Sequence, residues 1–403
     1  MRGGLVHSGV WMTTDPRHSL DDALGADLDA IEAAGLWREL REVESAQEPT
    51  VVLRGREVLL FCSNNYLGLA NHPDVVEAAR EAAGRYGASA GSSRLISGHM
   101  AAHRALEDRI CAWKGLPAAL VFSTGYQANL GAITSLTGPD DVVLSDSLNH
   151  ASIIDATRLA RSQTRIFRHN DLDHLEQLLR EAGSARRVLV VTEAIFSMDG
   201  DAAPLAEMGA LTRRYGAWLM VDEAHSVGVF GKGGAGLVDE LGLHDRVDVH
   251  VGTLGKALGS FGAYVAGSRR LVDLLVNQAR SFIFTTGLPP SAVAAAGAAI
   301  GVCEREPDLG AGLRRRVRSL ADRLRAAGLD VPEAESQILP VRIGDADRTV
   351  EVMRELLARG IYVAAIRPPT VPAGTSRLRF SVMATHTEEQ LDRAVAALCG
   401  SGG

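Results

Sequence analysis

The sequence predicts an α/β fold in which a mostly parallel sheet lies between helices and is followed by a smaller α+β domain. Short apolar segments alternate with helical ones from about residue 101 to residue 267. Such alternation is typical of a parallel sheet covered by helices on both faces. After about residue 300, helices and strands follow in a mixed order. A length of 403 residues is enough for two or more domains.

Four parts are expected along the chain. The N-terminal tail has one early arginine but no apolar core, so it does not read as a signal segment, and Met12 is an alternative start to Met1. Apolar residues at helical spacing then predict a helix from Asp21 to Glu44. The parts are a disordered tail at 1–20, an N-terminal helix with short strands at 21–62, a large α/β domain at 63–300 and a small C-terminal α+β domain at 301–403.

The elements of the two domains are predicted from periodicity and from turn residues. The strands expected in the large domain are 119–122, 141–145, 164–167, 187–192, 218–222 and 247–252. Its expected helices are 101–114, 127–136, 150–161, 171–182 and 204–215. Around and within the small domain, we expect helices at 289–305, 309–327 and 348–359 and strands at 338–342 and 378–381. Because ligands of parallel sheets bind at the carboxyl ends of the strands, the site is expected there.

Composition excludes several classes of function. The formal net charge is −7 and the pI is about 6.0, so no basic surface for nucleic acid is expected. No run approaches the ~18–20 apolar residues of a membrane span. The four cysteines are scattered and lack the spacing of metal ligands. We therefore expect a cytoplasmic protein that binds neither nucleic acid, membrane nor metal.

One lysine stands in a glycine-rich loop after an expected strand. Residues 251–262 read Val-Gly-Thr-Leu-Gly-Lys-Ala-Leu-Gly-Ser-Phe-Gly, and the lysine is Lys256. The glycines permit a tight backbone and the close approach of a ligand. A lysine held at the edge of a sheet can lose its proton and attack a carbonyl to form a Schiff base. Most lysines in glycine loops are merely solvated, so Lys256 becomes a candidate only in combination with a second motif.

The second motif is an apolar strand that ends in an aspartate. Residues 217–226 read Ala-Trp-Leu-Met-Val-Asp-Glu-Ala-His-Ser, which places Asp222 and His225 at the carboxyl end of the strand. An aspartate there and a lysine in the next loop suit pyridoxal phosphate. The lysine would carry this cofactor as a Schiff base, and the aspartate would pair with its pyridinium nitrogen. Glu193 and the loop around His150 fall at the same edge of the sheet.

Three further polar segments follow expected strands. Gly125 and Tyr126 open a helix, and the free amides of a helix N-terminus can hold a phosphate, although an ordinary capped helix has the same pattern. His150 stands at another strand-to-helix junction, where it can stack on a cofactor ring, move protons or merely cap the helix. Ser197, in a polar turn, can contact the phenolic oxygen of the cofactor or the substrate.

Three short patterns imitate other sites and are set aside. Residues 231–236 fit the dinucleotide pattern G-x-G-x-x-G but open no long helix. His99 and His103 have the spacing of a zinc pair but lack the glutamate of H-E-x-x-H. Residues 253–256 resemble S-x-x-K, without the partner motifs of that enzyme class.

A proline-rich loop near the C-terminus leads into a strand that carries two arginines. An arginine fixed there can bind a carboxylate with two hydrogen bonds. We assign this role to Arg379, which lies between Leu378 and Phe380. We expect Arg377 to point to the opposite face of the strand.

Together these motifs resemble the α-oxoamine synthases, pyridoxal-phosphate enzymes with the aspartate-aminotransferase fold (fold type I). The likeness runs from about residue 35 to the C-terminus. The segments that carry it are 63–68, 149–152, 196–201, 222–225 and 253–256. The stretch 367–375, Arg-Pro-Pro-Thr-Val-Pro-Ala-Gly-Thr, resembles the family members that act in biotin biosynthesis.

The resemblance implies roles for the residues around the cofactor ring. Lys256 would carry pyridoxal phosphate, and Asp222 would pair with its ring nitrogen. His150 would stack over the ring. His225, assisted by Ser197, would bind the phenolic oxygen. Lys256, His150 and Asp222 are therefore the expected catalytic residues.

The resemblance also implies which residues hold the phosphate and the substrates. Gly125, Tyr126 and Thr253 would bind the phosphate, and Thr286 would reach the phosphate of the neighbouring subunit in a homodimer. Arg379 would bind the amino-acid carboxylate. The residues that would line the acyl site are Asn64, Thr370 and Arg38.

The reaction implied is a decarboxylative condensation of L-alanine with a pimeloyl thioester, which releases carbon dioxide and the thiol carrier. The carrier would be coenzyme A or acyl carrier protein. An alternative within the family is glycine C-acetyltransferase, which would lack the proline-rich loop. A non-catalytic cofactor-binding module would lack the lysine or the aspartate.

Overall fold

The computed structural model describes residues 20–400. The tail predicted at 1–20 therefore lies outside the described residues, except for Leu20, which begins helix α1 (Leu20–Ala33). The chain forms two units, one ending at Val43 and one beginning at Glu44.

The first helix is shorter than predicted. It ends at Ala33, so the prediction of a helix through Glu44 was wrong for residues 34–44. Gly35 has φ 66°, and its amide donates to the carbonyl of Glu32, as happens where a helix ends in a left-handed residue. Apolar residues continue at helical spacing after Gly35, so the sequence pattern does not reveal that the helix ends there.

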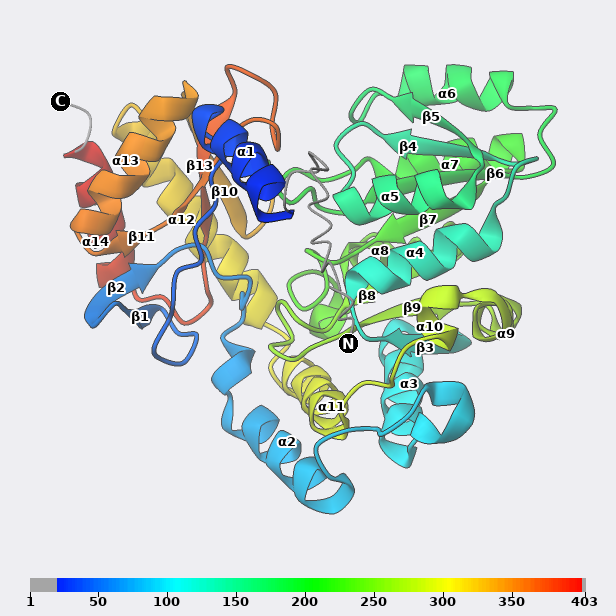
Figure 1. Ribbon diagram of the computed structural model, residues 1–403. Coiled ribbons are helices and arrows are strands. Elements are labelled where there is room, and N and C mark those ends of the chain that lie inside the picture. Colours follow the sequence, from blue (N-terminus) through cyan, green and yellow to red (C-terminus); the bar gives the residue numbers. More distant parts are fainter. Residues whose placement is uncertain (1–19, 401–403) are drawn as a thin grey trace, which may run out of the picture. The chain divides into compact units, whose positions relative to one another are not determined.

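A seven-stranded sheet forms the centre of the second unit, in the order β3-β9-β8-β7-β6-β4-β5 (Figure 1). Strand β9 is antiparallel to both of its neighbours, and the other neighbouring pairs are parallel. This arrangement confirms the predicted mostly parallel sheet. The strands are β3 (Ala118–Phe122), β4 (Val142–Asp146), β5 (Gln163–Phe167), β6 (Val188–Glu193), β7 (Trp218–Asp222), β8 (Val249–Thr253) and β9 (Ala263–Gly267).

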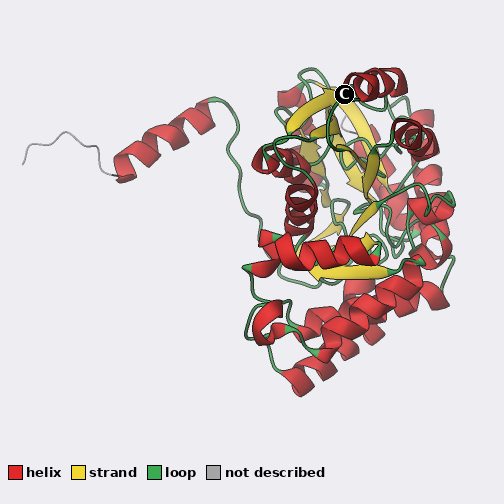
Figure 2. Ribbon diagram, turned by 90° about the vertical axis from the view of Figure 1, so that its right-hand side faces the viewer, coloured by secondary structure: helices red, strands yellow, loops and turns green. Residues whose placement is uncertain are grey.

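Helices cover both faces of this sheet (Figures 1 and 2). Successive side chains of a strand point to opposite faces, so Leu120 and Leu189 pack with α4, α5, α9 and α10, whereas Val121 and Val190 pack with α3, α6, α7 and α11. The helices are α2 (Pro73–Tyr86), α3 (Ala101–Lys114), α4 (Gly125–Leu136), α5 (Ala151–Ala160), α6 (Leu172–Glu181), α7 (Leu205–Tyr215), α8 (Leu237–Glu240), α9 (Arg269–Gln278), α10 (Arg280–Ile283) and α11 (Pro290–Arg305).

The predicted elements between residues 101 and 253 occur with boundaries within two residues of the prediction. Strand β9 and helices α9 and α10 were not predicted. The β9 segment is a short Ala-Tyr-Val-Ala-Gly run, and it becomes a strand because it pairs with β3 on one side and β8 on the other. Such pairing is not visible in local sequence.

The C-terminal part contains a second sheet of order β10-β13-β12. A third sheet, β1-β2-β11, joins strands from residues 50–60 with a strand after residue 360. Helix α14 was not predicted. The elements are β1 (Thr50–Leu53), β2 (Arg56–Leu60), α12 (Leu309–Ala326), β10 (Ile338–Gly344), α13 (Ala346–Ala358), β11 (Ile361–Tyr362), β12 (Ala364–Ile366), β13 (Ser376–Ser381) and α14 (Glu388–Cys399). Across residues 20–400, no helix has the length and apolarity needed to cross a membrane.

A fully buried ion pair connects α3 with the turn after β7. Lys114, the last residue of α3, donates from Nζ to the Glu223 carboxylate and to the Ala235 carbonyl, and neither charged side chain is exposed to solvent. Burial would raise the pKa of Glu223, but the positive charge of Lys114 and the nearby ring of His250, whose Nδ1 lies 3.7 Å from the carboxylate, lower it to about 2. The other carboxylate oxygen of Glu223 accepts the amide of Val238 at 3.1 Å.

Replacing Lys114 should therefore destabilise the protein strongly. Lys114→Met leaves the Glu223 carboxylate buried without its cation, and breaking a buried pair in this way costs ~3–5 kcal/mol of unfolding free energy. Urea denaturation at neutral pH measures this loss. Lys232→Met is the matched control, because Lys232 is exposed and its loss should change the stability by less than ~0.5 kcal/mol. Equal effects of the two substitutions would contradict the importance of the pair.

Candidate active site

The carboxyl ends of four parallel strands place polar side chains at one edge of the large sheet. Asp146, Glu193, Asp222 and Thr253 are the last residues of β4, β6, β7 and β8. Glu193 and Asp222 are direct neighbours in the pairing of β6 with β7. Lys256 follows three residues after β8. The edge predicted from the strand pattern therefore gathers three carboxylates and one lysine.

Lys256 lies against His225, and His225 lies against Tyr66. The Nζ atom of Lys256 is 2.7 Å from Nε2 of His225, and Nδ1 of the same ring is 2.7 Å from the hydroxyl of Tyr66. Burial lowers the pKa of Lys256 to about 8, although the negative charge of Asp222 opposes this effect. Burial and the nearby Lys256 also lower the pKa of His225 well below its ordinary value. The lowered pKa makes the neutral, nucleophilic amine far more accessible near neutral pH than it is for an ordinary lysine.

The chain contains only two other lysines. Lys114 is committed to the buried pair with Glu223, and Lys232 is exposed. Lys256 is thus the lysine of this chain that lies beside a histidine at the edge of the sheet.

Asp222 is held by two hydrogen-bond donors. Its Oδ1 accepts the amide of Ala224 at 2.9 Å, and its Oδ2 accepts Nδ2 of Asn129 at 2.8 Å. The residue is only 5% exposed. Asn129 lies within α4 and was missed by sequence reasoning, because a polar residue inside a helix resembles a surface residue.

His150 caps the N-terminus of α5. Its Nδ1 accepts the amide of Ser152 at 3.2 Å and lies 2.8 Å from the hydroxyl of that serine. The pKa of His150 is lowered, first because neighbouring atoms displace water from the ring, although the charge of Asp222 opposes this effect. The capping alternative is therefore realised in the structure, and it leaves the Nε2 side of the ring available for a further contact.

Glu193 is a buried carboxylic acid behind this site. Burial, followed by the negative charge of Asp222, raises the pKa of Glu193 to about 8, although a hydrogen bond from the backbone of His150 lowers it. Its Oε1 has no hydrogen-bond partner within residues 20–400. Glu193 therefore supports the His150 loop as a neutral group at neutral pH.

The start of α4 provides a place for a phosphate. The amides of Gly125 and Tyr126 lie in the first turn of the helix, where amides have no partner within a helix. A Cβ atom at Gly125 would lie 2.9 Å from Cγ2 of Thr253, so the helix and the lysine loop are in close contact there. The phenol of Tyr126 points to α5, where it donates to Asp155 at 2.5 Å. Only the backbone of Tyr126 therefore suits the predicted phosphate role.

Thr286 lies near the same helix N-terminus. Its backbone forms a bridge with Ser93, and its carbonyl accepts the hydroxyl of Ser123 at 3.4 Å. The residue itself is exposed. Its predicted contact with the phosphate of a second subunit stays a prediction.

Arg377 and Arg379 lie on the same face of β13, so the expectation of opposite faces was wrong. Residues two apart along a strand share a face. Both arginines reach the turn after β6: Arg377 pairs with Asp199, and Nε of Arg379 donates to the carbonyl of Ser197 at 2.5 Å. Arg379 also donates to the hydroxyl of Tyr66 at 3.3 Å.

The two arginines differ in whether an acidic residue of the chain already pairs with them. Arg377 is occupied by a carboxylate of its own chain. Among residues 20–400, Arg379 has an ion pair with no acidic residue, and its recorded partners are neutral oxygens of Ser197, Tyr66 and Ser381. The positive charge of Arg379 is therefore free to bind an anionic ligand.

The residues assigned to the acyl site differ in position. Thr370 and Ser197 line one cavity of about 630 Å³, together with the prolines of the C-terminal loop. Asn64 is exposed, and its side-chain oxygen accepts the hydroxyl of Tyr66 at 2.9 Å. Arg38 belongs to the first unit and is exposed, so its role stays a prediction.

A histidine that was not predicted joins two loops of this cavity. Nδ1 of His169 lies 3.0 Å from Asp146, and Nε2 lies 2.7 Å from Asp201. Burial lowers the pKa of His169, but the hydrogen bonds and charges of the two aspartates outweigh it and raise the pKa to about 10. The charged ring therefore ties the loop that carries His150 to the turn that carries Ser197.

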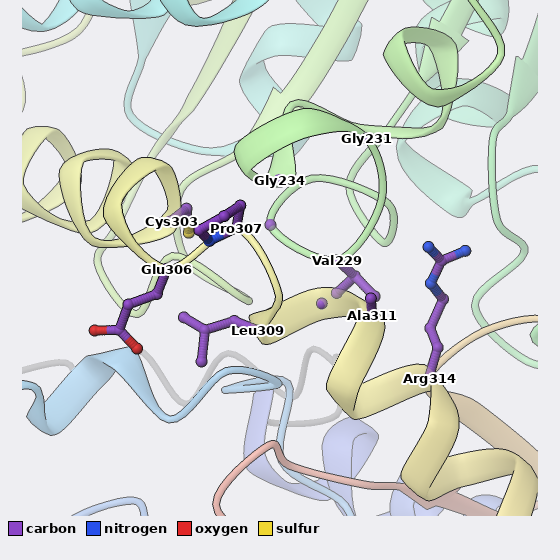
Figure 3. Close-up of a pocket in the computed structure, with 11 residues that line it drawn as sticks. Val229, Gly231, Gly234, Cys303, Glu306, Pro307, Leu309, Ala311 and Arg314 are labelled. Carbon is purple, nitrogen blue, oxygen red and sulfur yellow. The ribbon is translucent and has the colours of Figure 1, made fainter.

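The patterns set aside from the sequence do not form sites. Gly231 and Gly234 line a pocket of only about 30 Å³ against the α11–α12 connection (Figure 3), which is room for one or two water molecules. Nδ1 of His99 contacts the guanidinium of Arg94 at 2.8 Å, and Nε2 of His103 lies 3.0 Å from the carbonyl of Leu288. No cluster of three or more potential metal ligands occurs in the described part of the chain.

The arrangement suits pyridoxal phosphate. A lysine of lowered pKa, a buried aspartate oriented by two donors and a helix N-terminus meet at one edge of the sheet. These are the groups that an aldehyde, a ring nitrogen and a phosphate require.

The aminotransferase class I and II family matches residues 56–398 of this chain. An 8-amino-7-oxononanoate synthase of Geobacter sulfurreducens is 52% identical over 384 residues, which cover 94% of this chain and 98% of the relative. The enzyme of the same name from Anaeromyxobacter dehalogenans is 52% identical over 381 residues and covers 94% of each chain.

Solved structures agree with this assignment. A serine palmitoyltransferase of Sphingomonas wittichii has a TM-score of 0.89 and 36% identity, covering 94% of this chain and 96% of that one. Another serine palmitoyltransferase, solved with pyridoxal phosphate as an internal aldimine, also has a TM-score of 0.89 at 34% identity, covering 94% of this chain and 97% of that one. Since the family match spans most of the chain and its relatives share about half of its residues, the chain belongs to the aminotransferase class I and II family and, within it, to the α-oxoamine synthases.

Proposed function

We propose that the protein condenses L-alanine with a pimeloyl thioester to give 8-amino-7-oxononanoate, carbon dioxide and the free thiol, as a step of biotin biosynthesis. Relatives of about 50% identity over nearly the whole chain carry the name of this activity. The observation in the structure that carries the proposal is the contact of Lys256 with His225 beside Asp222. The acyl carrier is coenzyme A or acyl carrier protein.

The cofactor is pyridoxal phosphate, which supplies an aldehyde for the substrate amine and a ring that accepts electrons from the carbon that is deprotonated. Asp222 keeps a proton on the ring nitrogen, because a carboxylate beside an ionisable group shifts its pKa by ~1–3 units. The amides of Gly125 and Tyr126 and the side chain of Thr253 bind the phosphate. His150 would contact the cofactor ring.

Lys256 binds the cofactor in the resting enzyme and afterwards removes the α-proton of the amino acid. Its lowered pKa supports this role, because a general base works best with a pKa near the operating pH. Nε2 of His225, 2.7 Å from the amine, can accept or return a proton. His225 and Ser197 also bind the phenolic oxygen of the cofactor.

Both proposed substrate sites involve the turn after β6, because the carbonyl of Ser197 accepts from Arg379 and Ser197 also lines the cavity that contains Thr370. Arg379 takes the carboxylate of the amino acid. The cavity of about 630 Å³ lined by Thr370 and the prolines of the C-terminal loop receives the acyl chain, and its volume suits a chain longer than acetyl. Asn64 completes the acyl site in this proposal.

The direct test is a matrix of amino acids and acyl thioesters, with products identified by mass spectrometry. L-Alanine with pimeloyl-coenzyme A or pimeloyl acyl carrier protein should give 8-amino-7-oxononanoate, and glycine with acetyl-coenzyme A should give little product. Lys256→Arg should abolish the product while the protein stays folded. A preference for glycine and acetyl-coenzyme A would instead make the enzyme a glycine C-acetyltransferase, and Lys256, Asp222 and His225 would keep their roles.

Arg379→Ala should weaken binding of L-alanine. A lost hydrogen bond to a charged group costs ~1.5–3 kcal/mol, so the KM for alanine should rise roughly tenfold or more. The absorbance of the bound cofactor should stay unchanged. Arg377→Ala is the matched control, because its guanidinium already pairs with Asp199. If Arg377→Ala raised the KM and Arg379→Ala did not, the carboxylate site would belong to Arg377.

The protein is proposed to be a cytoplasmic homodimer. Large apolar side chains are exposed beside the Thr286 segment: Phe284 is 69% exposed, and Ile96, near the bridge from Ser93 to Thr286, is 81% exposed. Such exposure is typical of surfaces that bind another protein. Because Thr286 lies close to the phosphate site, burial of this surface by a second copy would bring the two sites together.

Light scattering at assay concentrations should therefore give the mass of a dimer. Phe284→Asp should shift the protein towards monomer, because it places a charge in the proposed interface. Ile166→Asp is the matched control, since Ile166 is 59% exposed on β5, away from this segment in the sheet. An active wild-type monomer would disprove the shared site.

A further inference from the structure

A single asparagine links two of the catalytic residues. Asn129, in α4, is 1% exposed, and its Nδ2 lies 2.8 Å from Oδ2 of Asp222 and 2.9 Å from Oγ of Ser152. An amide nitrogen has two hydrogens, so it can donate to both oxygens at once. The reversed orientation of the amide would place its oxygen against the carboxylate, which repels it. The nitrogen of Asn129 therefore faces Asp222.

The hydroxyl of Ser152 connects Asn129 to His150 through hydrogen bonds. Because Ser152 Oγ accepts a hydrogen from Asn129, its own hydrogen is free to donate to Nδ1 of His150 at 2.8 Å. The amide of Ser152 also points to Nδ1, at 3.2 Å, and an amide can only donate. With two donors directed at it, Nδ1 acts as an acceptor. The ring proton is therefore on Nε2.

We propose that Asn129 and Ser152 are positioning residues that orient Asp222 and hold His150 neutral, with its proton on Nε2. They act through Asp222 and His150. Neither sequence motif nor family resemblance assigned a role to Asn129 or Ser152. The inference rests on the proposed cofactor site but not on the identity of the two substrates.

The arrangement has a physical advantage for the cofactor. A protonated His150 would be a second cation near Asp222 and would compete with the ring nitrogen for the negative charge of that carboxylate. Donors directed at Nδ1 disfavour the protonated ring, and the lowered pKa of His150 agrees with this. The titratable groups around His150 are Asp222, Glu193, His225 and Lys256.

The tautomer can be measured without reference to turnover. We would label the histidine rings with ¹⁵N, bind pyridoxal phosphate to the full-length protein and record two-bond nitrogen–hydrogen spectra across a pH series. The signals of His150 are those that disappear in His150→Gln. In the wild type, Nδ1 of His150 should have the shift of an unprotonated nitrogen and Nε2 that of a protonated one.

Variants then test the connection. Ser152→Ala and Asn129→Ala should each raise the titration midpoint of His150 by ~0.5–1 pH unit, which is what one ordinary hydrogen bond contributes. Because both act through the same hydroxyl, the double variant should shift the midpoint by less than the sum of the two single shifts. Ser135→Ala is the matched control: Ser135 is also buried in α4, but its hydroxyl has no partner within the described residues.

Three outcomes would overturn the proposal. One is a wild-type His150 with its proton on Nδ1, which needs no variant to be observed. The second is a pair of shifts that add fully, because additivity would mean that the two residues act independently. The third is an equal shift in Ser135→Ala. Each of these results can occur even if the enzyme accepts other substrates, so failure of this proposal is distinguishable from failure of the proposed reaction.

Discussion

The buried ion pair between Lys114 and Glu223 is the interaction on which the geometry of the site depends. Both side chains are fully enclosed, so each charge is compensated only by the other and by hydrogen bonds from the protein. Glu223 lies directly between Asp222 and the turn at 224–229, which contains His225. Fixing Glu223 therefore also restrains Asp222 and His225, the two residues proposed to contact the cofactor. Its hydrogen bond with Val238 extends the same constraint to the start of α8.

Around this fixed turn, the edge of the sheet balances negative and positive groups. Parallel strands bring Asp146, Glu193 and Asp222 to one side, and three carboxylates so placed would repel one another if all were charged. The repulsion is reduced in a different way at Asp146 and at Glu193. His169, as a cation, compensates Asp146, whereas Glu193 takes up a proton because its pKa is raised. Asp222 is left as the carboxylate that is oriented by neutral donors and available to the cofactor.

In the proposed reaction, the chemistry of the family and the choice of substrate depend on different parts of the chain. Lys256, Asp222 and His225 lie on the large sheet, and their arrangement would serve any α-oxoamine synthase. The cavity proposed to receive the acyl chain is lined by Thr370 and its neighbouring prolines from the C-terminal loop and by residues of the turn after β6. Arg379 lies where these two parts meet, since it reaches from β13 to the carbonyl of Ser197. Specificity can therefore change through the C-terminal loop while the catalytic residues stay in place.

The sequence by itself determined the elements whose causes are local: the alternation of strands and helices, and the polar residues where strands end. Lys256, Asp222 and His150 were selected as candidates in this way because each follows the carboxyl end of a parallel strand. Only the tertiary structure decided the partners of these residues. Asn129 and Asp222 are 93 residues apart, and nothing in the helix around Asn129 distinguishes it from a surface residue. Likewise, β9 became a strand through its neighbours, and the pairing of Arg377 with Asp199 decided which arginine stays available. Hydrogen bonds and ion pairs between distant segments depend on how the layers pack, and local periodicity does not contain that information.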